Sequence, residues 1–189
     1  MKFVKINKSN IMLATKIQIE IFNDEKECAY FHYLNSFTSK KDYYIVYENN
    51  KIVGITGLYV DEFTQEKGVV WLGWFGVLPE YRRKGLGKKI LALTIEMAKK
   101  KGFDTLRLYT LSTYIPACHL YNEVMDICEE YRLEKLENCL IYSLSLRENV
   151  KVQKLGEKYL GMIWREKEQK EGLKIYKMKL KENKEKSVK

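Results

Sequence analysis

The chain is poor in proline, histidine and cysteine and has no long apolar run. Its 189 residues include two Pro, two His, four Cys and 11 Gly, without an internal repeat. This composition excludes collagen-like chains and low-complexity linkers. No stretch approaches the roughly 18–20 apolar residues that a membrane-spanning helix needs, and the N-terminus lacks the apolar core of a secretory signal. We therefore expect a soluble, cytoplasmic protein that does not bind membranes.

The cysteines and histidines show no metal-binding pattern. The cysteines are Cys28, Cys118, Cys128 and Cys139. They form no CxxC pair, and no histidine pair stands near them at ligand spacing. His119 adjoins Cys118, but neighbours on a helix point in different directions. We expect four reduced, mostly buried thiols and no metal site.

Apolar and charged residues are abundant. Apolar residues make up 46% and aromatic residues 13%, which is enough for a folded core and excludes a wholly disordered chain. The length suits one domain. The net charge is +9, and from residue 165 onward ten bases outnumber five acids. Acids interleave with the lysines there, so we expect a solvated end more than a nucleic-acid-binding segment.

Apolar periodicity predicts an alternation of strands and helices. Strands are expected at 3–6, 43–47 and 51–60, with helices from Ser9 as N-cap to Phe22 and from about 24 to 34. The continuously apolar run 69–77 predicts one strand buried on both faces. A helix follows from 86 to 101, with Leu86, Ile90, Leu93 and Met97 on its apolar face and Gly102 as C-cap. With a strand at 105–109, this makes a βαβ crossover.

The remaining segments are expected to be a helix at 115–125, strands at 127–132 and 139–146, an amphipathic piece at 152–160 and a strand-like alternation at 173–180. Only residues 181–189 are expected to fray.

The segment between the apolar run and its helix carries two glycines, Gly85 and Gly87. Free N–H groups and the positive dipole end of the helix meet there, so the main chain forms a site suited to phosphate or pyrophosphate. Cations surround it at Arg82, Arg83, Lys84, Lys88 and Lys89. The alternative is a plain turn whose glycines serve packing. The Walker pattern and the GxGxxG fingerprint both fail, because Arg82 and Ile90 stand where each needs glycine.

Two motifs resemble those of the GNAT superfamily of N-acetyltransferases. Arg82-x-x-Gly85-x-Gly87, preceded by Val77-x-Pro79, is similar to the family's acetyl-CoA signature, and Ala117-x-x-Leu120-Tyr121 is similar to its second motif. The resemblance implies an α/β GNAT fold. Its central sheet is mixed, mostly antiparallel and twisted, is splayed at the strand before the pyrophosphate loop, and is flanked by helices. We expect this domain at 1–146, a C-terminal extension packed on it at 147–180, and a frayed basic tail at 181–189.

The resemblance also implies roles for individual residues. Phe75, Gly76 and Val77 would pair with the pantetheine arm of acetyl-CoA through their backbone. The pyrophosphate would be held by Arg82, Arg83, Lys84, Gly85, Leu86, Gly87 and Lys88. Tyr121 would protonate the departing thiolate, a role that suits a phenol with a pKa near 10. The alternative for Tyr121 is a buried packing residue.

Three positions depart from the family pattern. Tyr114 stands where relatives often have a cofactor-binding Asn, and the Gly-Phe pair that often follows the second motif is absent. The central strand lacks the glutamate that often deprotonates the amine. A water relay or one of Asp61, Glu62 and Glu80 would replace it.

The acceptor implied by the resemblance is a primary amine on a small molecule or peptide. Candidate pocket residues are Phe31, His32, Tyr33, Trp71 and Trp74, which would favour an acceptor with apolar or aromatic parts; each can equally belong to the core. The residues after 147 can cover the acceptor, form a homodimer contact or extend the sheet. Two other functions stay open, namely a non-catalytic acyl-CoA-binding regulatory module and a basic nucleic-acid-associated protein.

Overall fold

The protein is described by a computed structural model that covers residues 1–22, 29–37, 41–61, 66–131 and 139–155. These residues form two compact units. Among the described residues, the first contains 1–56 and 74–83, and the second contains 57–73 and 84–155. Strand β3 (Lys51–Tyr59) passes from the first unit into the second. The strand order is β1-β2-β3-β4-β6-β8-β7, with β5 paired to β3, so the eight-stranded sheet is mixed and mostly antiparallel, as predicted.

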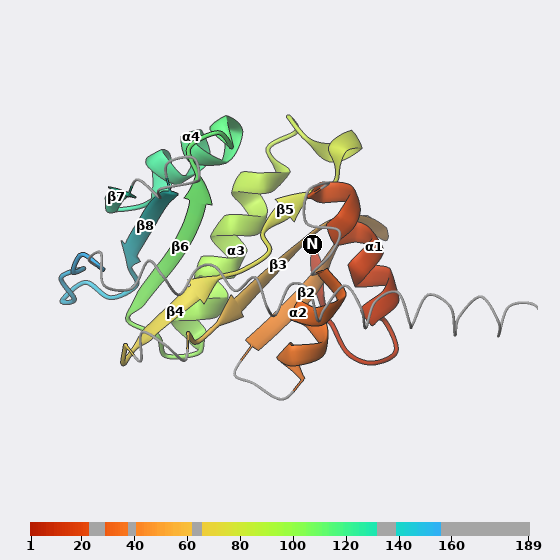
Figure 1. Cartoon of the computed structure of the whole chain (residues 1–189), viewed down its shortest axis with the longest axis horizontal. Helices are drawn as coiled ribbons and strands as arrows, with labels where there is room; N and C mark the ends of the chain where they lie inside the picture. Colours follow the sequence, from red (N-terminus) through yellow and green to blue (C-terminus); the bar gives the residue numbers. More distant parts are fainter. Residues whose placement is uncertain (23–28, 38–40, 62–65, 132–138, 156–189) are drawn as a thin grey trace, which may run out of the picture. The chain divides into compact units, whose positions relative to one another are not determined.

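The first unit is built on an antiparallel hairpin. Strand β1 (Lys2–Lys5) pairs with β2 (Lys41–Glu48), which turns into β3 through Asn49 and Asn50. Both asparagines have positive φ, as the tight turn of a hairpin requires. Helices α1 (Ile11–Ile21) and α2 (Ala29–Ser36) lie side by side on one face of this hairpin (Figure 1). The first half of the predicted second helix falls outside the described residues.

The start of α1 differs from the prediction. The N-cap is Asn10 and not Ser9, because the hydroxyl of Ser9 donates to Oδ1 of Asn7. Nδ2 of Asn10 donates to the carbonyl of Lys5, which ties the helix start to the end of β1. The core beneath this helix consists of Ile6, Ile11, Ala14, Ile17, Tyr30, Tyr33, Tyr43, Ile45, Ile55 and Leu78.

The apolar run 69–77 is not one strand, so that prediction is wrong. It divides into β4 (Val69–Leu72) and β5 (Gly76–Val77). Leu72 pairs with Leu58 and Gly76 with Ile55. The chain therefore advances four residues along the apolar run while β3 advances three. The extra residue makes a β-bulge, and Trp74 within it has a left-handed φ of 48°. The predicted splay before the glycine loop therefore corresponds to a break in the strand.

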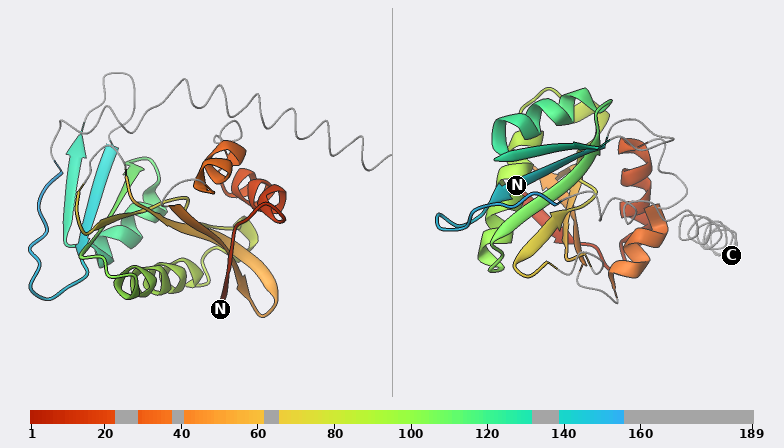
Figure 2. Two further views of the ribbon diagram at one scale, coloured as in Figure 1. Left: turned by 90° about the horizontal axis from the view of Figure 1, so that it is seen from below. Right: turned by 60° about the vertical axis from the view of Figure 1, so that its left-hand side comes forward.

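The second unit contains the predicted βαβ crossover. Strand β6 (Thr105–Leu111) runs parallel to β4 after α3 (Leu86–Lys100). Strand β8 (Cys139–Ser145) pairs antiparallel with β6, and β7 (Ile127–Tyr131) pairs antiparallel with β8. Helix α4 (Ile115–Val124) follows β6, and Figure 2 shows α3 and α4 together on one face of these strands.

Helix α3 ends one residue earlier than predicted and buries a different face. Its C-cap is Lys101 and not Gly102, which follows with a left-handed φ of 86°. The buried side chains are Ile90, Leu91, Thr94, Ile95 and Ala98. Leu93 is 39% exposed, so its predicted place on the apolar face is wrong. Leu91 and Ile95, which are four residues apart, lie on the buried face of the helix.

The second unit also orders the chain beyond the predicted domain boundary at residue 146. Val152 and Leu155 are buried, and the N–H of Leu155 donates to the buried carboxylate of Glu129 at 2.9 Å. The predicted strand at 173–180 and the tail at 181–189 lie outside the described residues. Of the three described cysteines, Cys139 alone is buried, Cys118 is half-buried and Cys128 is exposed, and all three are free thiols. Within the described ranges, no helix has the length and apolarity to cross a membrane.

Candidate functional site

The glycine loop leads directly into α3. A 3-10 turn, η2 (Pro79–Tyr81), precedes it, and Gly85 is the N-cap of α3 with a φ of 73°. Arg83 is also left-handed, with a φ of 59°. A Cβ added at Gly85 would meet no atom within 4 Å. The requirement for glycine here is therefore conformational, and the space above the helix start is open.

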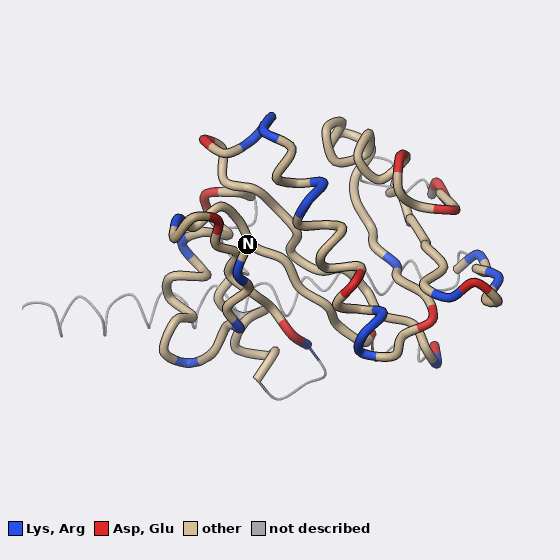
Figure 3. The backbone as a smooth tube through the Cα atoms, turned by 180° about the vertical axis from the view of Figure 1, so that it is seen from behind, with Lys and Arg blue, Asp and Glu red and all other residues tan. Residues whose placement is uncertain are grey.

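The start of α3 has the electrostatic character of an anion site. No side chain caps it, and its first turn holds no acidic residue. The first backbone N–H groups of a helix have no partner within the helix, and they add to the positive end of its dipole. Lysines and arginines colour the tube blue through this segment in Figure 3. The loop thus offers backbone donors and positive charge to a phosphate group.

Two of the predicted phosphate-binding cations have protein partners. Nε of Arg82 donates to the carbonyl of Val77 at 3.0 Å, and its Nη2 donates to the carbonyl of Ile21 at 3.2 Å. The guanidinium therefore ties the end of β5 to the last residue of α1. Nζ of Lys88 pairs with Glu123 at 3.0 Å in an exposed ion pair that an anion can displace.

The predicted pantetheine-binding segment is tightly packed on one side. Gly76 and Val77 pair with β3, and no strand pairs with the other edge of β5 among the described residues. A Cβ at Gly54 would overlap the carbonyl oxygen of Gly76, and one at Gly76 would overlap the side chain of Ile21. Gly54 and Gly76 let β3, β5 and α1 approach closely. The backbone along the outer edge of β5 can pair with an extended ligand.

Tyr121 lies within α4 and is 5% exposed. Its ring contacts that of Tyr142 at 5.4 Å between centroids, and Tyr142 donates to Oδ1 of Asn122 at 2.9 Å. Burial raises the pKa of Tyr121 well above its usual value, and the nearby Cys118 and Tyr142 raise it further. The phenol is therefore protonated at neutral pH. Tyr114, which replaces the expected Asn, is the N-cap of α4 and is exposed.

Of the predicted acceptor residues, two lie against each other and two are buried in cores. The rings of His32 and Trp74 lie 4.7 Å apart. Tyr33 is fully buried against Tyr43, and Trp71 is buried beside Tyr59 in the second unit, so both belong to cores. The side chain of Phe31 lies outside what the structure describes.

The sequence-predicted alternatives for the base are Asp61, Glu62 and Glu80. Glu80 is exposed in η2 in the first unit, Asp61 follows β3 in the second unit, and Glu62 lies outside the described residues.

Sequence reasoning missed two residues, Gln18 of α1 and Phe22 directly after it. Phe22 contacts the Trp74 ring edge-on at 5.8 Å, although its position in the apolar pattern indicated only a core residue. Gln18 is fully buried, and neither atom of its amide has a hydrogen-bond partner among the described residues. The one available signal was a glutamine within the apolar spacing of a helix.

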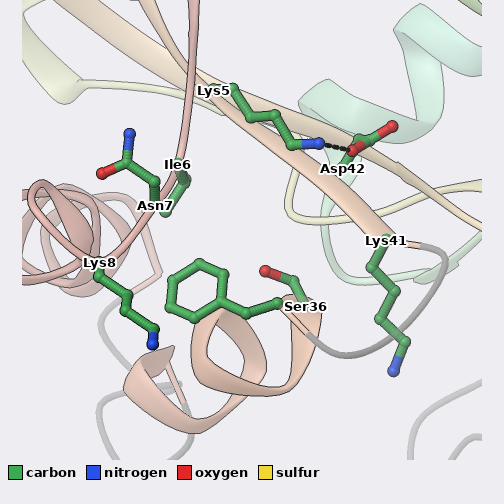
Figure 4. Close-up of a pocket in the computed structure, with 8 residues that line it drawn as sticks. Lys5, Ile6, Asn7, Lys8, Ser36, Lys41 and Asp42 are labelled. Atoms are coloured by element: carbon green, nitrogen blue, oxygen red, sulfur yellow. Dashed lines mark ion pairs between the residues drawn. The ribbon is translucent and has the colours of Figure 1, made fainter.

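A separate cavity of about 390 Å³ opens in the first unit (Figure 4). It is lined by Lys5, Ile6, Asn7, Lys8, Ser36, Phe37, Lys41 and Asp42. Lys5 and Asp42 form an ion pair at its edge, so part of its positive charge is neutralised. None of the predicted site residues lines this cavity.

The sequence profile of the acetyltransferase (GNAT) family matches residues 12–126. A comparison with curated proteins finds no match. Solved structures share the fold at low identity. The ribosomal-protein-S18-alanine N-acetyltransferase of Escherichia coli is 18% identical with a TM-score of 0.62, over 80% of this chain and 99% of that one. A Bacillus subtilis acetyltransferase in complex with CoA is 14% identical with a TM-score of 0.55, over 76% and 96%. The spermidine N-acetyltransferase of Vibrio cholerae is 10% identical with a TM-score of 0.61, over 77% and 95%.

Proposed function

Since the chain belongs to the acetyltransferase (GNAT) family, whose members use acetyl-CoA, we propose that it acetylates a primary amine by direct attack within a ternary complex. The observation that carries the proposal is the open start of α3 at Gly85, with its uncapped N–H groups and surrounding cations. A helix start of this kind binds phosphate groups, and CoA contains a pyrophosphate group.

The backbone from Arg83 to Lys88 binds the pyrophosphate in this proposal, with Arg83, Lys84 and Lys88 adding charge. Arg82 acts through its side-chain bonds to Val77 and Ile21, which fix the loop relative to β5. The outer edge of Phe75–Val77 pairs with the pantetheine arm as a further strand would. Backbone N–H groups of this segment then polarise the thioester carbonyl.

The chemical step is a nucleophilic displacement at the thioester carbonyl carbon. The neutral amine forms the new C–N bond, the C–S bond breaks, and the thiolate takes the proton of the Tyr121 hydroxyl. The amine passes its surplus proton to solvent, and solvent reprotonates Tyr121. Burial raises the pKa of Tyr121, so the phenol carries its proton before the reaction begins.

Calorimetric titration with acetyl-CoA tests the binding site. Gly85→Ala places a Cβ on a left-handed residue at the start of α3, and Gly102→Ala does the same just beyond its end. Both glycines have open space for the Cβ, so the two variants should lose similar stability, about 1 kcal/mol each. We expect Gly85→Ala to weaken acetyl-CoA binding by tenfold or more and Gly102→Ala to leave it unchanged. Equal affinities in the two variants would argue against the glycine loop as the binding site.

A further inference from the structure

Two charged residues of the second unit stand at helix ends that disfavour their charge. Lys88 is the third residue of α3, where the positive end of the helix dipole repels a cation. Glu123 is the last residue but one of α4, where the negative end of the dipole repels a carboxylate. Neither charge therefore stabilises the helix that carries it.

These two side chains form an ion pair that joins α3 to α4. Nζ of Lys88 lies 3.0 Å from a carboxylate oxygen of Glu123, so the start of α3 receives an anionic group from another helix. The side chains of Lys88 and Glu123 are 67% and 60% exposed. Exposed ion pairs are weak because water and salt screen them. An anion from solution can therefore reach Lys88 and replace the carboxylate.

A second ion pair on α3 shows the contrast. Glu96 and Lys99 are one helical turn apart, and Nζ of Lys99 also lies 3.0 Å from its carboxylate partner. Lys99 stands in the last turn of α3, where the dipole favours a cation, so this pair is explained by its own helix. The pair of Lys88 and Glu123 has no such local explanation, and it lies in the turn that directly follows Gly85.

We propose that Glu123 competes with the pyrophosphate of acetyl-CoA for Lys88 and thereby lowers the affinity of the protein for this cofactor. Binding exchanges the single charge of a carboxylate for the two charges of a diphosphate ester, so the exchange favours the cofactor. It also leaves the Glu123 carboxylate without its cation near the negative end of α4, which costs part of the binding free energy. CoA carries the same pyrophosphate, so the competition also favours release of the product. This inference rests on the proposed function, in which Lys88 adds charge to the pyrophosphate site.

Calorimetric titration with acetyl-CoA and with CoA tests the competition. Glu123→Gln removes the charge and keeps the size of the side chain, and Glu96→Gln makes the same change in the pair at the other end of α3. At low salt we expect Glu123→Gln to bind both ligands about fivefold more tightly than the wild type, and Glu96→Gln to bind them as the wild type does. The gain should disappear at about 1 M salt. Unchanged or weaker binding by Glu123→Gln at low salt would overturn the inference.

Lys88→Gln separates competition for the lysine from direct repulsion between Glu123 and the cofactor. In a protein that already lacks Lys88, the Glu123 carboxylate has no cation to lose when the cofactor binds. We therefore expect Glu123→Gln to change acetyl-CoA affinity about twofold or less in the Lys88→Gln background. The full fivefold gain in that background would show that Glu123 acts on the cofactor directly, and the proposed exchange would be wrong.

The wild-type titration and Tm distinguish the remaining outcomes. Because an exposed pair contributes little to stability, Glu123→Gln and Glu96→Gln should both keep the wild-type Tm. A lower Tm together with weaker binding in Glu123→Gln would assign the pair to the folding of α3 and α4 and overturn the inference. If the wild type binds no acetyl-CoA, the proposed function fails and the inference falls with it. If the wild type binds acetyl-CoA and Glu123→Gln binds it equally well, the inference alone is wrong.

Discussion

At the scale of single residues, burial keeps the Tyr121 phenol protonated at neutral pH, and the same burial makes it a weaker acid. The apolar surroundings oppose ionisation, and the thiol of Cys118 and the phenol of Tyr142 add to that effect. We expect Tyr121→Phe to lower kcat about a hundredfold with little change in the KM for acetyl-CoA, because the variant loses proton transfer and retains binding. Measured thiol release gives both constants. Tyr142→Phe, which removes the neighbouring hydroxyl that bonds to Asn122 and leaves the Tyr121 hydroxyl in place, is the control. A Tyr121→Phe variant with the wild-type rate would assign this residue to packing alone.

The same burial makes stability depend on alkaline pH. The pKa of Tyr121 is higher in the folded protein than in the unfolded chain, so above about pH 10 the unfolded chain loses a proton that the folded protein keeps. The free energy of unfolding then falls as pH rises, by up to about 1.4 kcal/mol per pH unit for this group. Urea denaturation at several pH values should show that Tyr121→Phe loses less stability above pH 10 than the wild type. If the free energy of unfolding fell equally with pH in the wild type and in Tyr121→Phe, the effect assigned to burial of Tyr121 would be contradicted.

At the scale of elements, the sequence predicts best where local rules decide the structure. The βαβ crossover follows from apolar periodicity, and the Asn49-Asn50 turn follows from residues that tolerate positive φ. The break at Trp74 could not be predicted in this way, because residues before and after a bulge are equally apolar. The role of Arg82 was hidden for a related reason, since its partner Ile21 is distant in the sequence and only the tertiary structure brings the two together.

The contacts of Arg82 predict a division of labour with its neighbour Arg83. Arg82→Gln removes the hydrogen bonds to Val77 and Ile21, and we expect a loss of about 1 kcal/mol in the free energy of unfolding. Arg83 is exposed in the loop, so Arg83→Gln should leave stability unchanged and weaken acetyl-CoA binding more strongly at low salt than at high salt. Urea denaturation and calorimetry on both variants measure the two effects. The opposite pattern, with stability lost in Arg83→Gln, would refute this assignment.

At the scale of the whole molecule, the predicted site divides into a part that sequence determines and a part that it does not. The glycine loop and the Tyr121 helix are short motifs whose backbone geometry is set by their own residues, and both have the expected local structure. The surroundings of the acceptor depend on which side chains are buried together. Tyr33 and Trp71 proved to be core residues, whereas Gln18 and Phe22 gave no sign of their neighbourhood in the sequence. Burial is a tertiary property, so a single sequence specifies it only in part.

The central claim, that the chain moves an acetyl group from acetyl-CoA to an amine, is tested most directly by one assay. The purified chain is mixed with acetyl-CoA and each member of a broad panel of primary amines, and both free thiol and acetylated amine are quantified over time. The account predicts one thiol released for each amide bond formed, at a rate well above that of the uncatalysed mixture. If the chain binds acetyl-CoA but releases no thiol with any amine in a broad panel, it is a non-catalytic acyl-CoA-binding protein, and the central claim is wrong.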